Sequence, residues 1–172
     1  MRLIRPVAVA AMLAVLLAPA LPAAERSEIP DQYKWNLADL YPNEAAWIAA
    51  KQDLVTSIPK LSEWQGRLGE SAATLLAAMT DWDRTRLKSQ RLYSYAFQLY
   101  DQDTRVSRSQ QMKQEASQVY TDLQTATAYM GPELISIGRA KIEGFIAAIG
   151  KVADTAGRHV IPLLLSQIIS HR

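Results

Sequence analysis

Residues 84–130 read RTRLKSQRLYSYAFQLYDQDTRVSRSQQMKQEASQVYTDLQTATAYM and contain two long segments with the same kind of pattern. Apolar residues of the first segment form a stripe of Leu87, Leu92, Tyr95, Ala96 and Leu99. Those of the second form a stripe of Met112, Ala116, Val119, Leu123, Ala126 and Met130. Recurrence every three or four residues is the period of an amphipathic α-helix. A short polar joint, residues 101–104, separates the two segments.

This arrangement predicts two long antiparallel helices, at about residues 84–101 and 105–130, because a short joint folds consecutive helices back on each other. Gly131 and Pro132 are expected to end the second helix. No stretch alternates apolar and polar residues in a sustained way, so the sequence predicts no strand. We therefore expect an all-α fold, a helical bundle built on this pair.

Residues outside the pair supply start and stop signals for further helices. Asn36 and Asn43 are expected N-caps, since their side chains can accept hydrogen bonds from the first amides of a helix, and Ser71 is expected to open a further helix. Pro42 and Pro59 are expected to end helical segments. Three further segments complete the prediction: 81–83 a turn or a continuing helix, 133–137 a short irregular link, and 141–148 a last amphipathic helix.

Composition excludes many kinds of chemistry. The chain has 172 residues, no cysteine, and two histidines, His159 and His171. Without cysteine there is no disulfide, no cysteine-based zinc or iron–sulfur site and no thiol nucleophile. The sequence contains neither a His-Glu-x-x-His helix nor a glycine-rich phosphate loop. With 49% hydrophobic and 21% charged residues, the chain is expected to fold rather than to remain disordered.

The first 24 residues have the layout of a cleavable signal peptide. Arg2 and Arg5 precede an uncharged apolar run, residues 7–17, and small residues follow in 18–24. The alternative, a membrane anchor, is disfavoured because this run falls short of the roughly 20 residues that a spanning helix needs. We expect a secreted or periplasmic bacterial protein, with no membrane attachment after cleavage.

Cleavage would also change the charge of the chain. The formal net charge of +2 comes from Arg2 and Arg5, so removing residues 1–24 leaves as many acidic as basic residues. A neutral, mixed surface gives no electrostatic reason to expect a nucleic-acid partner.

Candidate metal or proton-transfer groups have a stronger structural explanation. Asp101 and Asp103 could bind a metal or share a proton, but two acids in a joint between helices are more often caps. His159 and His171 would lack a third zinc ligand at a sensible spacing. On these grounds we assign no catalytic, cofactor-binding or metal residue to the chain.

Two further groups invite a binding function. Tyr93, Tyr95, Phe97 and Tyr100 could form a ligand platform, although their spacing favours core and partner contacts. A basic cluster follows Asp81 and Asp83, which favours a solvated helix face over a phosphate site. That cluster consists of Arg84, Arg86, Lys88 and Arg91.

Several strings resemble one peptidase family. Residues 28–41, EIPDQYKWNLADLY, are similar to the start of oligoendopeptidase F, and the resemblance continues through Trp47. It recurs at residues 59–68, at 92–96 with the Asp101-x-Asp103 pair, and at 132–134. It fades after Phe145, so it covers about residues 28–147. The string Tyr-Lys-Trp-Asn-Leu-x-Asp-Leu-Tyr-Pro is its most specific part.

The resemblance implies a thimet-like zinc oligopeptidase that cuts short peptides inside a deep, mostly helical cavity. In that family the zinc ligands, a His-Glu-x-x-His pair and a later Glu, follow far downstream of this region. The resemblance therefore carries over no catalytic or metal residue, and this chain would bind no zinc itself. It implies that residues 25–148 are an amino-terminal helical domain that forms part of the channel wall. Its partners would be a missing catalytic domain or another copy of the chain, and oligopeptides in the intact enzyme.

The tail, residues 149–172, departs from the family pattern. It ends in an apolar run, 160–169, interrupted by Pro162. A truncated gene product, a frame shift and a natural short protein each account for such a tail, and we favour truncation. Two functions stay open: part of an exported oligopeptidase that is inert alone, or a stand-alone exported helical protein that binds a peptide or a protein.

Overall fold

The computed structural model describes residues 28–152 and Pro162, and every regular element in that part of the chain is helical. The predicted all-α class is confirmed. The predicted signal peptide and most of the tail lie outside the described residues. The chain divides into two units after Trp35. Of the first unit, residues 28–35 are described, and they contain one 3₁₀ turn, η2 (Asp31–Tyr33), with Tyr33 and Trp35 exposed.

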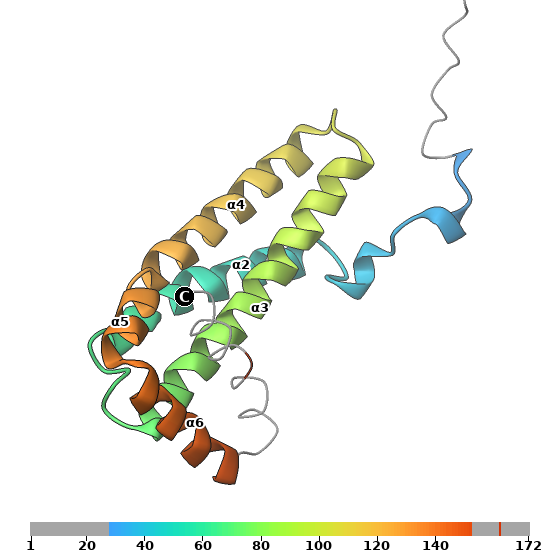
Figure 1. The fold of residues 1–172 in the computed structure, drawn as a ribbon. Coiled ribbons are helices and arrows are strands. Elements are labelled where there is room, and N and C mark those ends of the chain that lie inside the picture. Colours follow the sequence, from blue (N-terminus) through green and yellow to red (C-terminus); the bar gives the residue numbers. More distant parts are fainter. Residues whose placement is uncertain (1–27, 153–161, 163–172) are drawn as a thin grey trace, which may run out of the picture. The chain divides into compact units, whose positions relative to one another are not determined.

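Two long helices dominate the second unit (Figure 1). They are α3 (Ala72–Gln102) and α4 (Ser107–Thr127), and they form the predicted antiparallel hairpin. Helix α3 begins earlier than residue 84, because Ser71 caps it through the amide of Thr74 and residues 81–83 continue the helix. Asp81 and Asp83 each pair with an arginine three residues later, which supports helical geometry there.

The expected end of the second helix at Gly131-Pro132 is wrong. Helix α4 ends at Thr127, and both residues lie in the first turn of α5 (Met130–Ile137). Proline is tolerated there because the first amides of a helix have no carbonyl partner within it. Residues 133–137 were expected to form an irregular link. They continue α5 after the proline and are helical. The predicted last helix extends over α6 (Arg139–Val152).

Helix α2 (Glu44–Ser57) covers one side of the hairpin and begins at the predicted cap, Asn43. The indole Nε1 of Trp47 donates a hydrogen bond to the carbonyl oxygen of Leu92 at 3.0 Å. Ion pairs link Lys51 to Glu115 of α4 at 2.6 Å, and Asp53 to Lys88 of α3 at 2.7 Å. The buried cluster at this junction consists of Trp47, Leu54, Ile58, Leu61, Leu92, Tyr95, Ala96, Met112, Ala116, Val119 and Leu123.

A short helical turn precedes α2. The 3₁₀ turn η3 (Leu37–Asp39) is capped by Asn36, whose side chain accepts a hydrogen bond from the amide of Ala38. Arg91 of α3 donates to the carbonyl oxygens of Asp39 and Leu40, which holds this turn against the hairpin.

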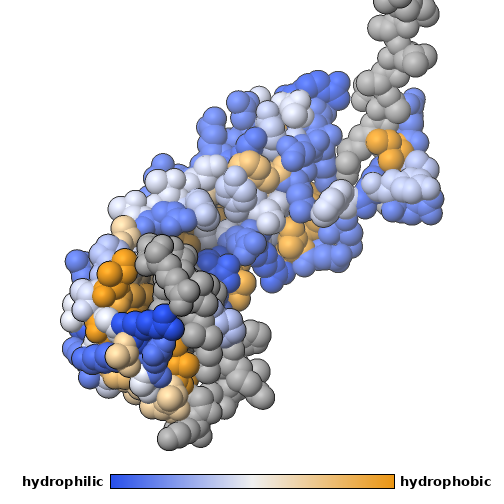
Figure 2. Space-filling model, viewed as in Figure 1, coloured by the Kyte–Doolittle hydropathy of each residue, from blue (hydrophilic) through white to orange (hydrophobic). Residues whose placement is uncertain are grey.

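A second buried cluster lies where η4 (Ile58–Trp64), α5 and α6 meet the start of α3. Its buried members are Leu68, Leu75, Ala78, Met79, Met130, Leu134 and Ile142. Glu133 stabilises this end, because its two carboxylate oxygens accept hydrogen bonds from the amides of Gly66 and Leu68, each at 2.8 Å. Apolar side chains also reach the surface there, over α5 and α6 (Figure 2).

Candidate functional site: the aromatic face of the α3–α4 hairpin

Aromatic side chains line one side of the hairpin. We call this surface the aromatic face and define it by Trp82, Tyr93, Phe97 and Tyr100 of α3 and Tyr120 of α4. The rings of Tyr93 and Phe97 are stacked with centroids 3.8 Å apart, and the ring of Tyr120 lies 5.9 Å from that of Tyr93. The α3 members are half-buried and Tyr120 is exposed, so the face is open to ligands or partners.

The helical rotation explains why this side is open. Leu92 and Tyr95 face the core that α2 covers, and Tyr95 meets Tyr41 edge to face with centroids 5.5 Å apart. Consecutive residues of an α-helix are rotated by about 100°. Phe97 is therefore turned away from that core, whereas Tyr93 is half-buried and packs against the edge of it.

The predicted platform of Tyr93, Tyr95, Phe97 and Tyr100 is only partly assembled. Tyr95 is 7% exposed and belongs to the core, where burial raises its pKa above the usual value. Leu87, expected in the apolar stripe, is 52% exposed because its position on the helix is turned away from both α2 and α4. Sequence reasoning missed Trp82, which falls at helical spacing from the other α3 members, and Tyr120, which comes from the other helix.

Two cations lie over rings of the aromatic face. The ammonium Nζ of Lys113 is 4.0 Å from the ring centroid of Tyr100 and 4.6 Å from that of Phe97. The guanidinium of Arg86 is 5.7 Å from the ring of Trp82 and forms an ion pair with Asp83 at 2.8 Å. Cation–π contacts of this kind stabilise a charge without neutralising it. Lys113 was not identified from the sequence.

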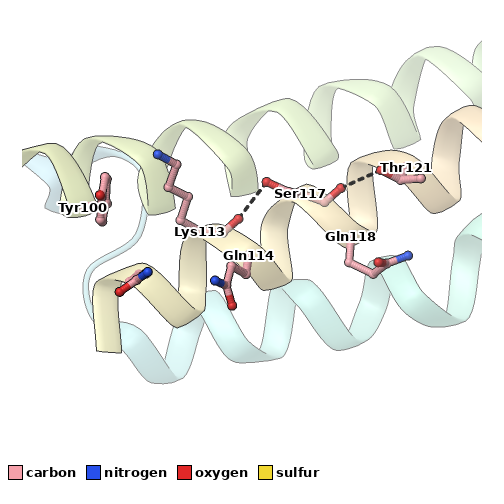
Figure 3. A pocket seen from close by; sticks show the side chains of 7 residues that line it. Tyr100, Lys113, Gln114, Ser117, Gln118 and Thr121 are labelled. Atoms are coloured by element: carbon pink, nitrogen blue, oxygen red, sulfur yellow. Dashed lines mark hydrogen bonds between the residues drawn. The ribbon is translucent and has the colours of Figure 1, made fainter. Parts of the chain in front are cut away.

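Hollows occur along this face. One, of about 400 Å³, is lined by Tyr100, Gln110, Lys113, Gln114, Ser117, Gln118 and Thr121 (Figure 3). A second, of about 250 Å³, lies beside Trp82, Arg86 and Tyr120. A third, of about 200 Å³, lies between Trp82, Met130 and Leu134. The second and third share Trp82, Gln124 and Thr127, so they adjoin.

The basic cluster does not converge on one site. Arg84 and Arg86 pair with Asp81 and Asp83 of their own helix. Lys88 and Arg91 contact α2 and the turn before it, as described above. Each of the four cations has a partner within the chain.

Of the acidic pair, Asp103 has a structural role. Asp103 accepts a hydrogen bond from the amide of Arg105 and pairs with its guanidinium at 2.8 Å. These hydrogen bonds lower the pKa of Asp103 to about 2. Asp101 lies in the last turn of α3 and is exposed.

Metal-binding side chains do not gather in the described part of the chain. Within residues 28–152 no three histidine, cysteine, aspartate or glutamate side chains gather closely enough to hold a metal ion. His159 and His171 lie outside the described residues. In the same part of the chain, no helix has the length and apolar character needed to cross a membrane.

Taken together, the described residues define a helical hairpin domain with an open aromatic face. Oligopeptidase PepF of Bacillus subtilis is 38% identical over 122 residues, which are 71% of this chain and 18% of that protein. Oligoendopeptidase F (plasmid) of Lactococcus lactis subsp. cremoris is 26% identical over 133 residues, 77% of this chain and 22% of that protein. Group B oligopeptidase PepB of Streptococcus agalactiae is 25% identical over 122 residues, 70% of this chain and 20% of that protein.

The resemblance to the oligoendopeptidase F family is thus confirmed, and this chain is related to those proteins over most of its own length. It spans about a fifth of the length of the curated relatives that it matches, which is consistent with a partial N-terminal region. No protein-family profile and no solved structure matches the chain.

Proposed function

We propose that this chain is the amino-terminal, channel-wall part of an exported zinc oligoendopeptidase and has no peptidase activity alone. The observation that carries this proposal is the 38% identity over 71% of the chain to a protein named an oligopeptidase. The covered share, 18% of that protein, leaves ample length for a separate catalytic portion.

The ligand count supports the expected inactivity. A catalytic zinc needs three protein ligands and a general base. Residues 28–152 offer no such group, and the two histidines of the sequence are not spaced as in a His-Glu-x-x-His helix. In the intact enzyme, zinc would be held by the remaining portion and would activate the water that attacks the peptide bond. The residues of this chain would shape the cavity around the peptide.

The aromatic face supports a wall function. Its α3 rings are half-buried, and all of its rings lie on two helices that a buried core holds together. Aromatic side chains offer large contact area at low entropic cost, which suits either a substrate channel or a contact with another domain.

The test is a peptidase assay on the purified chain with an internally quenched oligopeptide and added zinc. We expect no cleavage above background. A truncated variant of the Bacillus subtilis relative, from which the stretch that matches this chain has been deleted, should be added next. We expect the mixture to cleave the peptide, and we expect a chelator to abolish this cleavage. Chelator-sensitive cleavage by the chain alone would contradict the proposed inactivity. No restoration by a folded, soluble partner would contradict the wall function.

Export is tested separately. Cell fractionation with amino-terminal sequencing should find a mature chain that begins between residues 21 and 25, outside the cytoplasm. A chain that keeps Met1 and stays in the cytoplasm would overturn this part of the proposal.

A second candidate function is a stand-alone exported protein that binds a peptide or another protein. The hollows along the aromatic face favour it, because ligand sites are concave and lined with aromatic and a few polar groups. The neighbouring downstream DNA discriminates between the two functions. A reading frame there that encodes His-Glu-x-x-His supports the oligopeptidase, and its absence supports the stand-alone protein.

A further inference from the structure

The ammonium of Lys113 has two aromatic rings beside it and no carboxylate partner within the described residues. The charged residues near it on α4 do form ion pairs: Arg108 pairs with Glu44 at 2.6 Å, and Glu115 pairs with Lys51. A cation over aromatic rings keeps its full charge. The hollow that Lys113 lines therefore presents a positive charge that the described chain does not compensate.

The other polar groups of this hollow indicate which chemical groups a ligand would carry beside its anion. The hydroxyls of Ser117 and Thr121 donate to helix carbonyls, at 2.9 and 3.0 Å, and so are not free to donate to a ligand (Figure 3). The side-chain amides of Gln110 and Gln114 make no hydrogen bond within the described residues, and they line the hollow. A carboxamide can both donate and accept, as the backbone of an extended peptide requires.

The spacing along α4 sets the length of such a ligand. At a rise of about 1.5 Å per residue, Tyr120 lies roughly 10 Å and Gln124 roughly 16 Å along the helix from Lys113. An extended peptide covers about 3.3–3.6 Å per residue, so three to five residues reach from Lys113 to the hollow beside Trp82 and Tyr120. The lining of that second hollow includes the rings of Trp82 and Tyr120 and the side chain of Leu123, which suit a large apolar side chain.

We propose that the aromatic face binds the carboxyl-terminal end of a short peptide, with its terminal carboxylate on Lys113 and an apolar side chain three to four residues earlier against Trp82. The choice of a peptide rests on the proposed function, whereas the carboxylate follows from the uncompensated charge of Lys113. The backbone between these ends lies along Gln114, Ser117 and Tyr120. A second copy of this chain, or a carboxylate of the missing portion of the enzyme, would be a competing occupant.

The experiment is isothermal titration calorimetry of the purified chain with the N-acetylated pentapeptide Phe-Ala-Ser-Ala-Ala, as the free acid and as the carboxyl-terminal amide. We expect the free acid to bind about tenfold more tightly than the amide, because one charge-assisted contact to Lys113 is lost. This comparison uses the unmodified protein, so it does not depend on whether a variant folds. Added salt should reduce the difference in affinity between the free acid and the amide, because it screens the charge of Lys113.

Two lysine variants locate the site. Lys113→Met should bind acid and amide equally weakly, while keeping the aromatic contacts of an unbranched side chain. Lys141→Met is the matched control, because Lys141 also lies over a ring, that of Phe145 at 5.7 Å, but does not line the hollow. It should bind the free acid like the unmodified chain. Circular dichroism and urea unfolding should show both variants folded.

The remaining outcomes overturn the proposal. Equal affinity for acid and amide would exclude the carboxylate contact. Unchanged affinity in a folded Lys113→Met variant would place the peptide elsewhere, and no binding of either peptide at millimolar concentration would exclude a peptide subsite. Sedimentation showing a dimer that Lys113→Met dissociates would assign the face to a second copy. None of these binding results depends on the peptidase assay. The proposed wall function and the proposed carboxylate site can therefore be contradicted separately.

Discussion

Trp47 shows how much of this fold depends on one side chain. It is fully buried, its ring lies in the junction of α2, α3 and α4, and its indole N–H bonds to the backbone of α3. The neighbouring residue Ile48 is apolar too, but it is 41% exposed. Two adjacent apolar residues therefore contribute very differently to stability.

We expect Trp47→Ala to lower the free energy of unfolding by about 3–5 kcal/mol, because it removes a large buried side chain and leaves a cavity. Ile48→Ala is the matched control and should change it by about 0.5 kcal/mol or less. Urea unfolding followed by circular dichroism measures both. Similar values for the two variants would contradict the placement of Trp47 in the core.

Tyr129 is the second instructive residue. Its hydroxyl donates to the carbonyl oxygen of Leu61 at 2.7 Å, and burial raises its pKa to about 12. The folded chain therefore retains this proton above the pH at which the unfolded chain, with a tyrosine pKa near 10.0, has lost it. A raised pKa in the folded state means stability that is complete below pH 10 and lost as the pH rises towards 12.

We predict that stability falls between about pH 10 and pH 12, and that Tyr129→Phe reduces this fall. The free energy of unfolding of the variant should also be lower by about 1 kcal/mol at neutral pH, because the hydrogen bond to Leu61 is removed. Tyr41 and Tyr95 also have raised pKa values through burial, so part of the fall should remain. Urea unfolding at a series of pH values checks this. An unchanged slope in the variant would show that Tyr129 does not contribute.

At the scale of elements, the connection from α5 to α6 depends on its backbone conformation. Gly138 follows α5 with φ of +84°, a region that residues with a side chain rarely adopt. Its amide donates to the carbonyl of Ile135 at 3.2 Å, which ends the helix. Gly144, by contrast, lies within α6, where a side chain would meet nothing within 4 Å.

Replacing these two glycines should have opposite effects. Gly138→Ala should destabilise the chain by about 1–3 kcal/mol, because alanine is strained at that φ. Gly144→Ala should stabilise it by about 0.5–1 kcal/mol, because glycine is a poor residue within a helix. Thermal or urea unfolding of the two variants side by side provides the measurement. A stabilising Gly138→Ala would be incompatible with the described turn.

At the scale of the whole molecule, two surfaces have apolar or aromatic character. One is the aromatic face, and the other is the end formed by α5 and α6, where Trp64, Ile137, Phe145 and Ile146 are only partly buried (Figure 2). Exposed patches of this kind usually mark a contact with a partner. After removal of residues 1–24, equal numbers of acidic and basic residues give no net repulsion between copies.

We therefore expect the isolated chain, residues 25–172, to self-associate or to become soluble when the missing portion is supplied. The apolar run 160–169 in the sequence adds to this expectation. Sedimentation velocity over a range of concentrations measures it. A stable monomer at high concentration would instead favour the stand-alone binding protein.

Most of the local structure could be predicted from the sequence. Helical periodicity and the caps at Asn36, Asn43 and Ser71 depend on residues a few positions apart, so they are readable without the fold. Two helical stretches were harder to predict: residues 81–83 and the helix that contains Gly131 and Pro132. The residues at both places are compatible with a turn as well as with a helix.

Only the tertiary structure decided which side of α3 is covered. Tyr93 and Tyr95 look alike in the sequence, yet packing against α2, some 40 residues earlier in the chain, buries Tyr95 in the core and leaves Tyr93 only half-buried beside it. Lys51 and Lys113 also look alike, but packing brings a carboxylate to the first and two rings to the second. The sequence by itself determined the helices and the family resemblance, because both reside in short strings of residues. The aromatic face and the uncompensated charge arise from contacts between distant segments, which no local pattern specifies.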